Sequence, residues 1–319
     1  MISLRELAEK IKGEKSVALF CHVRPDGDTI GSALGLKLAL ETLGIKADVF
    51  CDDPVPSRFS FLKETAYIKN EISDNYSAFI AIDCADIQRL GGFAEKFLAH
   101  KNTYVIDHHI SNDRFAKTSY VFDNASNCEN VLAPIEELGA PISVDMANLL
   151  ATGVMTDTGN FRHKNVTAQT LHSAGKLVEK GADLNNIYFH TFSAQSKERA
   201  KLFGRTMEKI RYFFDGRFAV ATVRLSDFAA VGAKQEETEG FIDFVMGIVG
   251  VEIGACVMEI KPDKFKISFR SKSADVNAVA GSFGGGGHTL ASGCQINGEY
   301  EEVIDKIQFA VGRELPDIL

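Results

Sequence analysis

Three ionisable residues stand together at the end of an apolar segment, in the stretch YVIDHHI at 104–110. Its first three residues are typical of a buried strand, and Asp107, His108 and His109 follow them. Burying a carboxylate and two imidazoles without partners would cost several kcal/mol. Because successive side chains of a strand point to opposite faces, we expect the two histidines to face in opposite directions. Either a solvated loop begins here, or these three groups bind a cation.

Further carboxylates and a histidine follow other apolar segments. The stretch HVRPDGD places His22, Asp26 and Asp28 directly after an apolar run, Asp83 ends the run SAFIAID, and Asp157 ends an apolar, helix-like run. Taken alone, each has an ordinary explanation, such as a turn after Asp26 or a helix cap at Asp157. In an open parallel sheet, however, ligands bind beyond the carboxyl ends of the strands. We therefore expect these groups to converge at one edge of a sheet.

Several aspartates with two or three histidines form a ligand set that suits Mn²⁺, Fe²⁺ or Zn²⁺. Without a metal such carboxylates would repel one another, and some would stay protonated. Two divalent cations about 3.5–4 Å apart would relieve the repulsion and activate a water for in-line attack on phosphorus. Asp83, expected between two strands, is well placed to bridge two such ions.

The segments that must position these groups alternate over the first 190 or so residues. Strand-like apolar runs lie at 16–22, 47–52, 77–83 and 103–109. Helical patterns lie at 29–44, 127–139, 143–156 and 167–181. Alternation of this kind, with nearly continuous apolar strands, predicts an α/β fold: a doubly wound, mostly parallel sheet with helices on both faces.

The pattern changes near residue 191. We predict a catalytic domain at 1–190, a helical linker at 191–205 and a smaller mixed α/β domain at 206–319. The last has strand-like runs at 217–225, 252–260 and 264–272, a hairpin turn at 261–263, and a final helix at 299–313.

A glycine run, GGGGH at 284–288, lies in this second domain. Residues without Cβ let backbone N–H groups approach an anion closely. Five basic residues between 261 and 272 form a nearby cationic patch, in which Arg270 can hold a phosphate with two parallel hydrogen bonds. Taken alone, the glycine run is equally typical of a flexible loop beside a solvated hairpin.

Composition narrows the class of protein. The formal charge is −8, from 35 basic and 43 acidic residues, which argues against a protein that follows long nucleic-acid duplexes. No apolar run approaches the ~20 residues of a membrane span, and the first residues lack the apolar core of a signal peptide. The six scattered cysteines contain no C-x-x-C pair and fit a reducing compartment. We therefore expect a cytoplasmic protein without membrane association.

Taken together and in order, these motifs resemble the DHH phosphoesterase family. The matching stretches are HVRPDGDTIGS, AIDCAD, VIDHH and GVMTDTGNF, followed by FRSK and GGGGHTLASG of the DHH-associated C-terminal domain. They span nearly the whole chain. The compact two-domain size is similar to that of the NrnA-type oligoribonucleases, which degrade very short RNAs and in many cases dephosphorylate 3′-phosphoadenosine 5′-phosphate (pAp).

The resemblance implies roles for individual residues. One Mn²⁺ would be held by His22, Asp26 and Asp83. A second would be held by Asp28, Asp83, His108 and Asp157. Asp107 would orient an imidazole, and His109 would face the phosphate and assist the leaving group. The substrate would be bound in a cleft between the two domains by Arg270, Ser271, Gly285, Gly286, Gly287 and His288.

The expected function is a Mn²⁺-dependent hydrolase acting on short single-stranded RNA and pAp, and not on long duplexes. Dimerisation is common among such relatives. A phosphodiesterase for cyclic di-AMP or its linear product is an alternative. RecJ-like exonucleases are usually larger, and inorganic pyrophosphatases lack the glycine-run domain. A non-catalytic nucleotide-binding regulatory module is the remaining alternative, and the presence of every candidate ligand argues against it.

Overall fold

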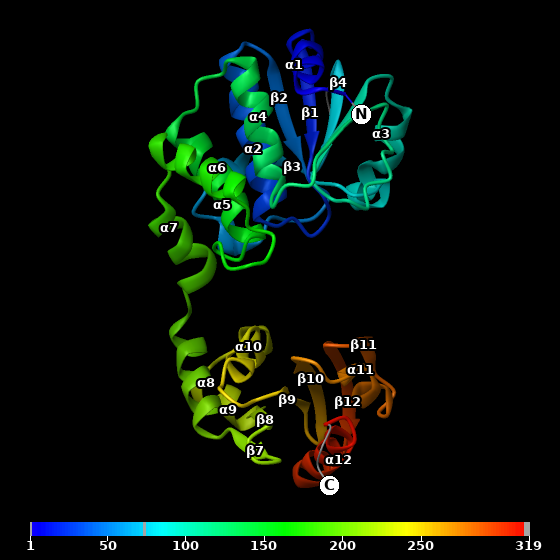
Figure 1. Ribbon diagram of the computed structural model, residues 1–319, viewed down its shortest axis with the longest axis vertical. Coiled ribbons are helices and arrows are strands. Elements are labelled where there is room, and N and C mark those ends of the chain that lie inside the picture. Colours follow the sequence, from blue (N-terminus) through cyan, green and yellow to red (C-terminus); the bar gives the residue numbers. More distant parts are fainter. Residues whose placement is uncertain (1, 73–74, 316–319) are drawn as a thin grey trace. The chain divides into compact units, whose positions relative to one another are not determined.

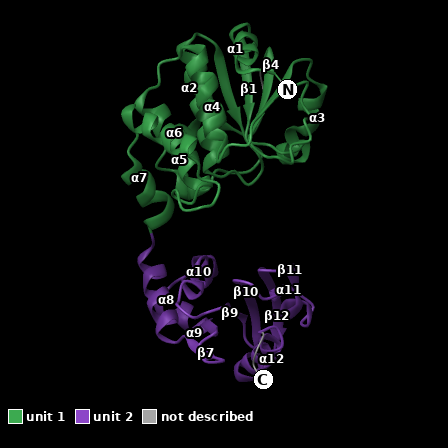
Figure 2. Cartoon of the chain, in the orientation of Figure 1, with its two compact units in different colours: residues 1–194 green, residues 195–319 purple. Residues whose placement is uncertain are grey.

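The computed structural model describes residues 2–72 and 75–315. Its internal contacts divide the chain into two units, residues 1–194 (unit 1) and 195–319 (unit 2), coloured separately in Figure 2. The segment expected to be a linker, 191–205, overlaps helix α8 (Lys197–Glu208), which belongs to unit 2 and buries Leu202 there.

Unit 1 contains a sheet of six parallel strands in the order β3-β2-β1-β4-β5-β6. The strands are β1 (Ser16–Phe20), β2 (Lys46–Phe50), β3 (Ile68–Lys69), β4 (Ala78–Ile82), β5 (Thr103–Asp107) and β6 (Thr118–Val121). The chain builds outward from β1 to β3, then returns to place β4 on the other side of β1. The carboxyl ends of β1 and β4 therefore form the point at which the strand order reverses.

Both faces of this sheet are covered, which confirms the predicted arrangement (Figure 1). Alternate residues of β1 serve the two sides: Val17 and Leu19 pack in one core, and Ala18 and Phe20 in the other. The first core includes residues of α1 (Leu4–Lys12), α2 (Gly27–Thr42), α4 (Asn127–Leu138) and α5 (Val144–Asp157). The second is rich in phenylalanine and includes η3 (Ile87–Phe93) and α3 (Ala94–Ala99). Burial on both faces explains why the strand sequences are almost continuously apolar.

Smaller elements complete unit 1. Helices α6 (Ala168–Glu179) and α7 (Leu184–Tyr188) pack against α5. Short helical turns lie at η1 (Ser57–Phe59), η2 (Lys63–Tyr67) and η4 (Phe189–Ser193). Among the helices that the structure describes, none has both the length and the apolar character needed to cross a bilayer.

Unit 2 contains a mixed sheet in the order β11-β12-β10-β9-β8-β7, in which β8 and β9 are parallel and the other neighbours antiparallel. The strands are β7 (Arg211–Phe213), β8 (Phe218–Val223), β9 (Ile253–Lys261), β10 (Lys264–Ser271), β11 (Gly286–His288) and β12 (Ala291–Asn297). The predicted smaller α/β domain and its hairpin between β9 and β10 are confirmed.

The helices of unit 2 cover its sheet unequally. On one face, α11 (Val276–Gly281) and α12 (Tyr300–Gly312) bury Phe265, Ile267 and Phe269 of β10. On the other face, α8, α9 (Leu225–Val231) and α10 (Phe241–Met246) pack over β8 and β9. On that second face β10 carries Lys266, Ser268 and Arg270, which no hydrophobic core includes.

Candidate metal centre

The ends of β1, β4 and β5 carry the ionisable residues singled out in the sequence, at the edge where the strand order reverses. Thr29, in the first turn of α2, ties two of these ends together. Its hydroxyl accepts a hydrogen bond from the backbone N–H of His22 (3.3 Å) and donates one to the carbonyl of Ile82 (3.0 Å). His22 is thereby held beside Asp83, with 3.5 Å between His22 Nε2 and Asp83 Oδ2.

Helix α2 supplies two carboxylates from its first turn. Asp26 is the N-cap: its Oδ1 accepts hydrogen bonds from the N–H groups of Asp28 and Thr29, which explains locally why the helix begins here. The capping role does not remove Asp26 from the site, because the same oxygen lies 3.5 Å from His22 Nε2. The turn and the metal-ligand interpretations of Asp26 are therefore compatible.

Asp28, in the first turn of α2, is fully buried and faces the start of α4. Its Oδ1 accepts hydrogen bonds from the Ser126 hydroxyl (2.8 Å) and the Cys128 N–H (2.9 Å), and its Oδ2 accepts one from the Asn127 N–H (2.5 Å). Oδ2 also lies 3.9 Å from His108 Nε2. Three donors fix this carboxylate, and none of them was identified from the sequence.

Asp83 is the residue on which the site converges. Three groups of potential ligand atoms lie close enough to hold an ion: His22 with Asp26 and Asp83; Asp28 with His108 and Asp157; and Asp83 with His108 and His109. Asp83 is 2% exposed and has a left-handed backbone with φ of 59°, a conformation that non-glycine residues seldom adopt. Within the described part of the chain, its buried Oδ1 has no hydrogen-bond partner. A buried carboxylate oxygen without a donor fits a cation, because leaving it unsatisfied would be costly.

The expectation that His108 and His109 face opposite ways is wrong. Strand β5 ends at Asp107, so the two histidines lie outside the strand and its alternation does not apply to them. Their ring centroids are 4.5 Å apart, and both rings approach the same atom: Asp83 Oδ1 lies 3.3 Å from His108 Nε2 and 3.6 Å from His109 Nδ1.

Backbone carbonyls orient two of the imidazoles. The Nδ1–H of His22 donates to the Val23 carbonyl (2.8 Å), and the Nδ1–H of His108 donates to the Asn124 carbonyl (3.0 Å). In both rings Nε2 is consequently the nitrogen that faces the carboxylates. Nε2 of His108 also lies 3.5 Å from Asp157 Oδ2 at the end of α5. Such anchoring of the remote ring nitrogen is the arrangement that metal-binding histidines require.

His109 is held differently. Its Nδ1 lies 2.8 Å from Oδ1 of Asp107, a fully buried carboxylate. The other oxygen of Asp107 accepts a hydrogen bond from Asn112 Nδ2 (2.6 Å), which also donates to the Cys84 carbonyl. The hydrogen bonds that link Asn112, Asp107 and His109 thus fix the imidazole of His109. Sequence reasoning missed Asn112, although it lies in the same stretch, DHHISN, only five residues after Asp107.

The pKa values follow from burial and from these contacts. Burial alone would lower the pKa of His22, but the contacts with Asp26 and Asp83 outweigh burial and raise the pKa to about 10. Burial likewise opposes protonation of His108, and Asp83 and Asp28 raise its pKa. Burial and repulsion from Asp28 and Asp83 raise the pKa of Asp157 far above the ordinary range for a carboxyl group. Without metal, bound protons therefore reduce the repulsion among these carboxylates. A divalent cation would replace the protons.

In unit 2, the structure brings together two of the residues assigned to substrate. Arg270 on β10 and His288 on β11 both lie opposite Ala291 of the intervening strand β12. Residues directly opposite one another share a face, so Arg270 and His288 lie on the same face of the sheet. The guanidinium of Arg270 donates to the Phe269 carbonyl (3.0 Å) and forms no ion pair within the described residues. The Ser271 hydroxyl accepts hydrogen bonds from Ser273 N and Ala274 N in the turn after β10.

The glycine run is only partly a loop. Gly286, Gly287 and His288 form strand β11, which pairs with β12. A Cβ on Gly285 would lie 2.3 Å from the Gly293 carbonyl oxygen, and one on Gly287, where φ is 154°, would lie 2.5 Å from that of Ala291. Close approach to β12 therefore accounts for two of the four glycines without any ligand. The interpretation of the whole run as an anion-binding loop is corrected to this extent.

Comparisons with known proteins match both units of the chain to known domains. The model of the DHH family, N-terminal domain, matches residues 16–154, and that of the DHHA1 domain matches 215–315. A bifunctional oligoribonuclease and PAP phosphatase NrnA from Thermus thermophilus is 29% identical, and the alignment covers 98% of this chain and 94% of that protein. A protein of the same name from Bacillus subtilis is 26% identical, with 91% and 92% covered. Among solved structures, an exopolyphosphatase-related protein from Bacteroides fragilis gives a TM-score of 0.78 at 24% identity, covering 97% of this chain and 95% of that one. It shares the fold.

Proposed function

The chain belongs to the DHH family and is a metal-dependent phosphoesterase, and we propose that it hydrolyses short oligoribonucleotides and pAp with two Mn²⁺ ions. The names of the relatives supply the substrates in this proposal. The choice of metal follows from the types of the candidate ligands, because carboxylates combined with imidazoles suit Mn²⁺ and these groups contain no thiolate.

One observation carries the proposal: His22, His108 and His109 all approach a single buried carboxylate, Asp83, one of whose oxygens has no hydrogen-bond donor among the described residues. One ion would be held by His22, Asp26 and Asp83. The other would be held by Asp28, Asp83, His108 and Asp157. Asp83 faces His22 with Oδ2 and His108 with Oδ1, so this one carboxylate would supply a ligand to each ion.

When bound, the metal would supply a water activated for attack on phosphorus and would neutralise charge on the phosphoryl oxygens. The protein groups have separate tasks. Asp107, held by Asn112, accepts from the Nδ1–H of His109 and raises the pKa of that imidazole, so that the protonated ring would donate from Nε2 to a phosphoryl or leaving oxygen. In unit 2, Arg270 and His288 would bind an anionic part of the substrate from one face of the sheet.

The proposal is tested by a turnover panel with Mn²⁺. It comprises pAp, a dinucleotide, a pentanucleotide RNA, a ~24-nucleotide RNA and cyclic di-AMP, at matched concentrations of RNA ends. Rapid hydrolysis of pAp and the short RNAs, with little action on the long strand, is the expected result. Preference for cyclic di-AMP would replace the substrate assignment while keeping the metal chemistry. Activity on none of these compounds would overturn the proposal.

The residue assignments are tested by His108→Ala, with His172→Ala as the control. His172 is an exposed histidine on α6 and belongs to none of the candidate ligand groups. We expect His108→Ala to lose at least about a hundredfold in kcat, the scale of a missing catalytic metal ligand, together with bound Mn²⁺. The control should keep both. Full activity in His108→Ala would remove this site from the proposal.

A further inference from the structure

Helix α12 of unit 2 carries an exposed aromatic ring on its outer face. Its inner face buries Val303, Ile307 and Val311 in the core of unit 2, whereas Phe309 on the outer face is 73% exposed. Phenylalanine is among the residues that are most often fully buried. A single exposed ring is nevertheless ordinary on a protein surface, so its surroundings decide whether it marks a contact.

A hollow of about 480 Å³ lies on this outer face. Phe309 and Gly312 of α12 border it, together with Phe214 from the turn between β7 and β8. A Cβ on Gly312 would lie only 3.0 Å from Cζ of Phe214, so the ring packs against the helix where no side chain stands between them. Two phenylalanine rings therefore border one concave surface, which is large enough to receive an aromatic side chain from a partner.

The turn between β7 and β8 holds Phe214 in this position against its backbone preference. Phe214, Asp215 and Gly216 have φ values of 53°, 54° and 86°, all in the left-handed region. A bulky residue rarely adopts this conformation, which persists only where the surrounding structure enforces it. Packing of Phe214 against the core of unit 2 provides that support. Backbone strain is concentrated at functional positions, which favours a role for the hollow.

Two opposite charges flank Phe309 on the same face of the helix. Asp305 precedes it by four residues and Arg313 follows it by four, and residues four apart are neighbours on a helix surface. Glu302 and Lys306 of the same helix pair with each other. Asp305 and Arg313, in contrast, are exposed and form no ion pair with any described residue. Both charges are therefore free to meet a partner.

The order acid, ring, base along this face is complementary to a reversed copy of itself. In a contact with twofold symmetry, each residue of one copy meets the residue at the mirrored position of the other copy. With the axis at Phe309 and the two helices antiparallel, Asp305 of each copy lies opposite Arg313 of the other. The two Phe309 rings then meet near the axis, beside the hollows that Phe214 borders.

We propose that the outer face of α12 is the surface through which two copies of this chain associate. Phe309 of each copy enters the hollow of the other, and Asp305 pairs with Arg313 across the axis. The proposal is independent of the proposed function, because none of these residues belongs to the candidate metal centre or to the residues assigned to substrate.

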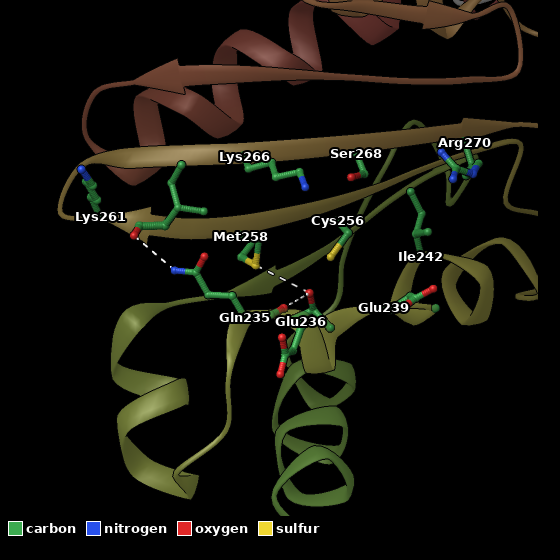
Figure 3. A pocket seen from close by; sticks show the side chains of 13 residues that line it. Gln235, Glu236, Glu239, Ile242, Cys256, Met258, Lys261, Lys266, Ser268 and Arg270 are labelled. Atoms are coloured by element: carbon green, nitrogen blue, oxygen red, sulfur yellow. Dashed lines mark hydrogen bonds between the residues drawn. The ribbon is translucent and has the colours of Figure 1, made fainter. Parts of the chain in front are cut away.

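The position of α12 separates this contact from the open face of the unit 2 sheet, the face that carries Lys266, Ser268 and Arg270 (Figure 3). Both copies would therefore keep that face uncovered. A contact along one helix is smaller than the roughly 1,200–2,000 Å² that stable complexes bury. The pair should consequently form at high protein concentration and dissociate on dilution.

Sedimentation equilibrium of the full-length protein between about 5 and 500 µM measures this association. We expect the mean mass to rise from that of a monomer towards that of a dimer. Phe309→Ser should weaken association by at least about tenfold, whereas Phe244→Ser, which removes a half-exposed ring on α10, should change it by less than about twofold. A mean mass that does not change with concentration, or equal losses in the two variants, would overturn the proposal.

Charge exchange tests the pairing across the axis. Asp305→Arg alone and Arg313→Asp alone should each weaken association by at least about tenfold, because each variant places like charges opposite one another. A 1:1 mixture of the two variants should associate as the wild-type protein does, since each copy then meets the opposite charge at both positions. Both residues are exposed, so neither substitution removes a core contact. Single variants that associate as strongly as wild type, or a mixture that stays dissociated, would overturn the pairing.

Discussion

At the scale of single residues, Asp83 and the histidines around it set the chemistry of unit 1. The raised pKa values of His22, His108 and Asp157 mean that the metal-free site keeps protons well above neutral pH. A metal ion must displace these protons, because an imidazole nitrogen that carries a proton cannot bind a cation.

We therefore predict that Mn²⁺ affinity rises with pH. The His22 pKa of about 10 keeps its ring protonated from pH 6.5 to 8.5, so each unit of pH within that window should raise the affinity by about tenfold for each proton displaced. Calorimetric titration at several pH values measures the affinity, and the use of two buffers with different ionisation enthalpies counts the protons released. An affinity that stays constant across this window, without proton release, would contradict the protonated resting state.

Asn112 gives a second prediction at this scale. In Asn112→Ala, the buried Oδ2 of Asp107 loses its donor, which costs about 1–3 kcal/mol and frees Asp107 to move away from His109. We expect kcat for pAp to fall about tenfold. KM and bound Mn²⁺ should stay nearly unchanged.

The matched control is Asn102→Ala. Asn102 lies at the start of β5, at the opposite edge of the sheet, where its side chain bonds Glu14. This variant should lose stability without losing kcat. If both variants lower kcat equally, Asn112 acts through the fold and not through His109.

At the scale of elements, close packing of α2 against α5 places Asp28 near Asp157. A Cβ on Gly31 would lie 2.2 Å from the Leu149 carbonyl oxygen, and one on Gly153 would lie 2.7 Å from Asp28 Oδ1. The two helices can approach this closely only because glycine occupies these positions. The geometry of the second ligand group thus depends on a helix–helix distance.

Gly31→Ala should consequently lower the free energy of unfolding by about 1–3 kcal/mol, because a backbone atom cannot move aside for the added methyl group. It should also weaken Mn²⁺ binding. Gly175→Ala on α6 is the control: a Cβ there meets nothing within 4 Å, so better helix propensity should stabilise the protein by about 0.5–1 kcal/mol. Urea denaturation measures both. Equal effects of the two substitutions would refute the packing argument.

Much of the element order could be predicted from sequence, for physical reasons. Strands β1, β4 and β5 are buried on both faces, so each is a nearly continuous apolar run with an evident end. Strand β2 was recognisable from its buried Ala47, Val49 and Phe50. Strands β3 and β6 were missed, since two and four residues carry too little pattern to be recognised. The pairing of β11 with β12 was missed as well. Two strands whose backbones pack closely are marked in the sequence only by glycine, which is equally typical of a loop.

The candidate site could be predicted only in part. The ionisable residues were identifiable because they interrupt apolar runs at the ends of strands. Their orientations were not, since His108 and His109 lie beyond the strand whose alternation would have fixed them. The donors that hold Asp28 come from residues 126–128, a hundred positions along the chain, and no local pattern points to such a contact.

At the scale of the whole molecule, charge distribution limits the polymer that the protein can bind. The chain has a net charge of −8, and several basic residues of unit 2 are neutralised by carboxylates. Among the described residues, few unpaired cations line the open face of the unit 2 sheet. Affinity for RNA should therefore come from a small number of phosphate contacts and should not increase with strand length.

Salt dependence measures that number. For single strands, log affinity falls with log salt at a slope of about −0.7 for each phosphate neutralised. With one phosphate contact at Lys266 and a second at Arg270, KM for a trinucleotide should rise about sevenfold between 50 and 200 mM KCl, a slope of about −1.4. Lys266→Ala should remove about half of that slope, because one of the two contacts is lost. A slope near −4 in the wild-type protein would require six or so phosphate contacts, which the acidic surface does not offer, and would show that a longer basic track exists elsewhere on the molecule.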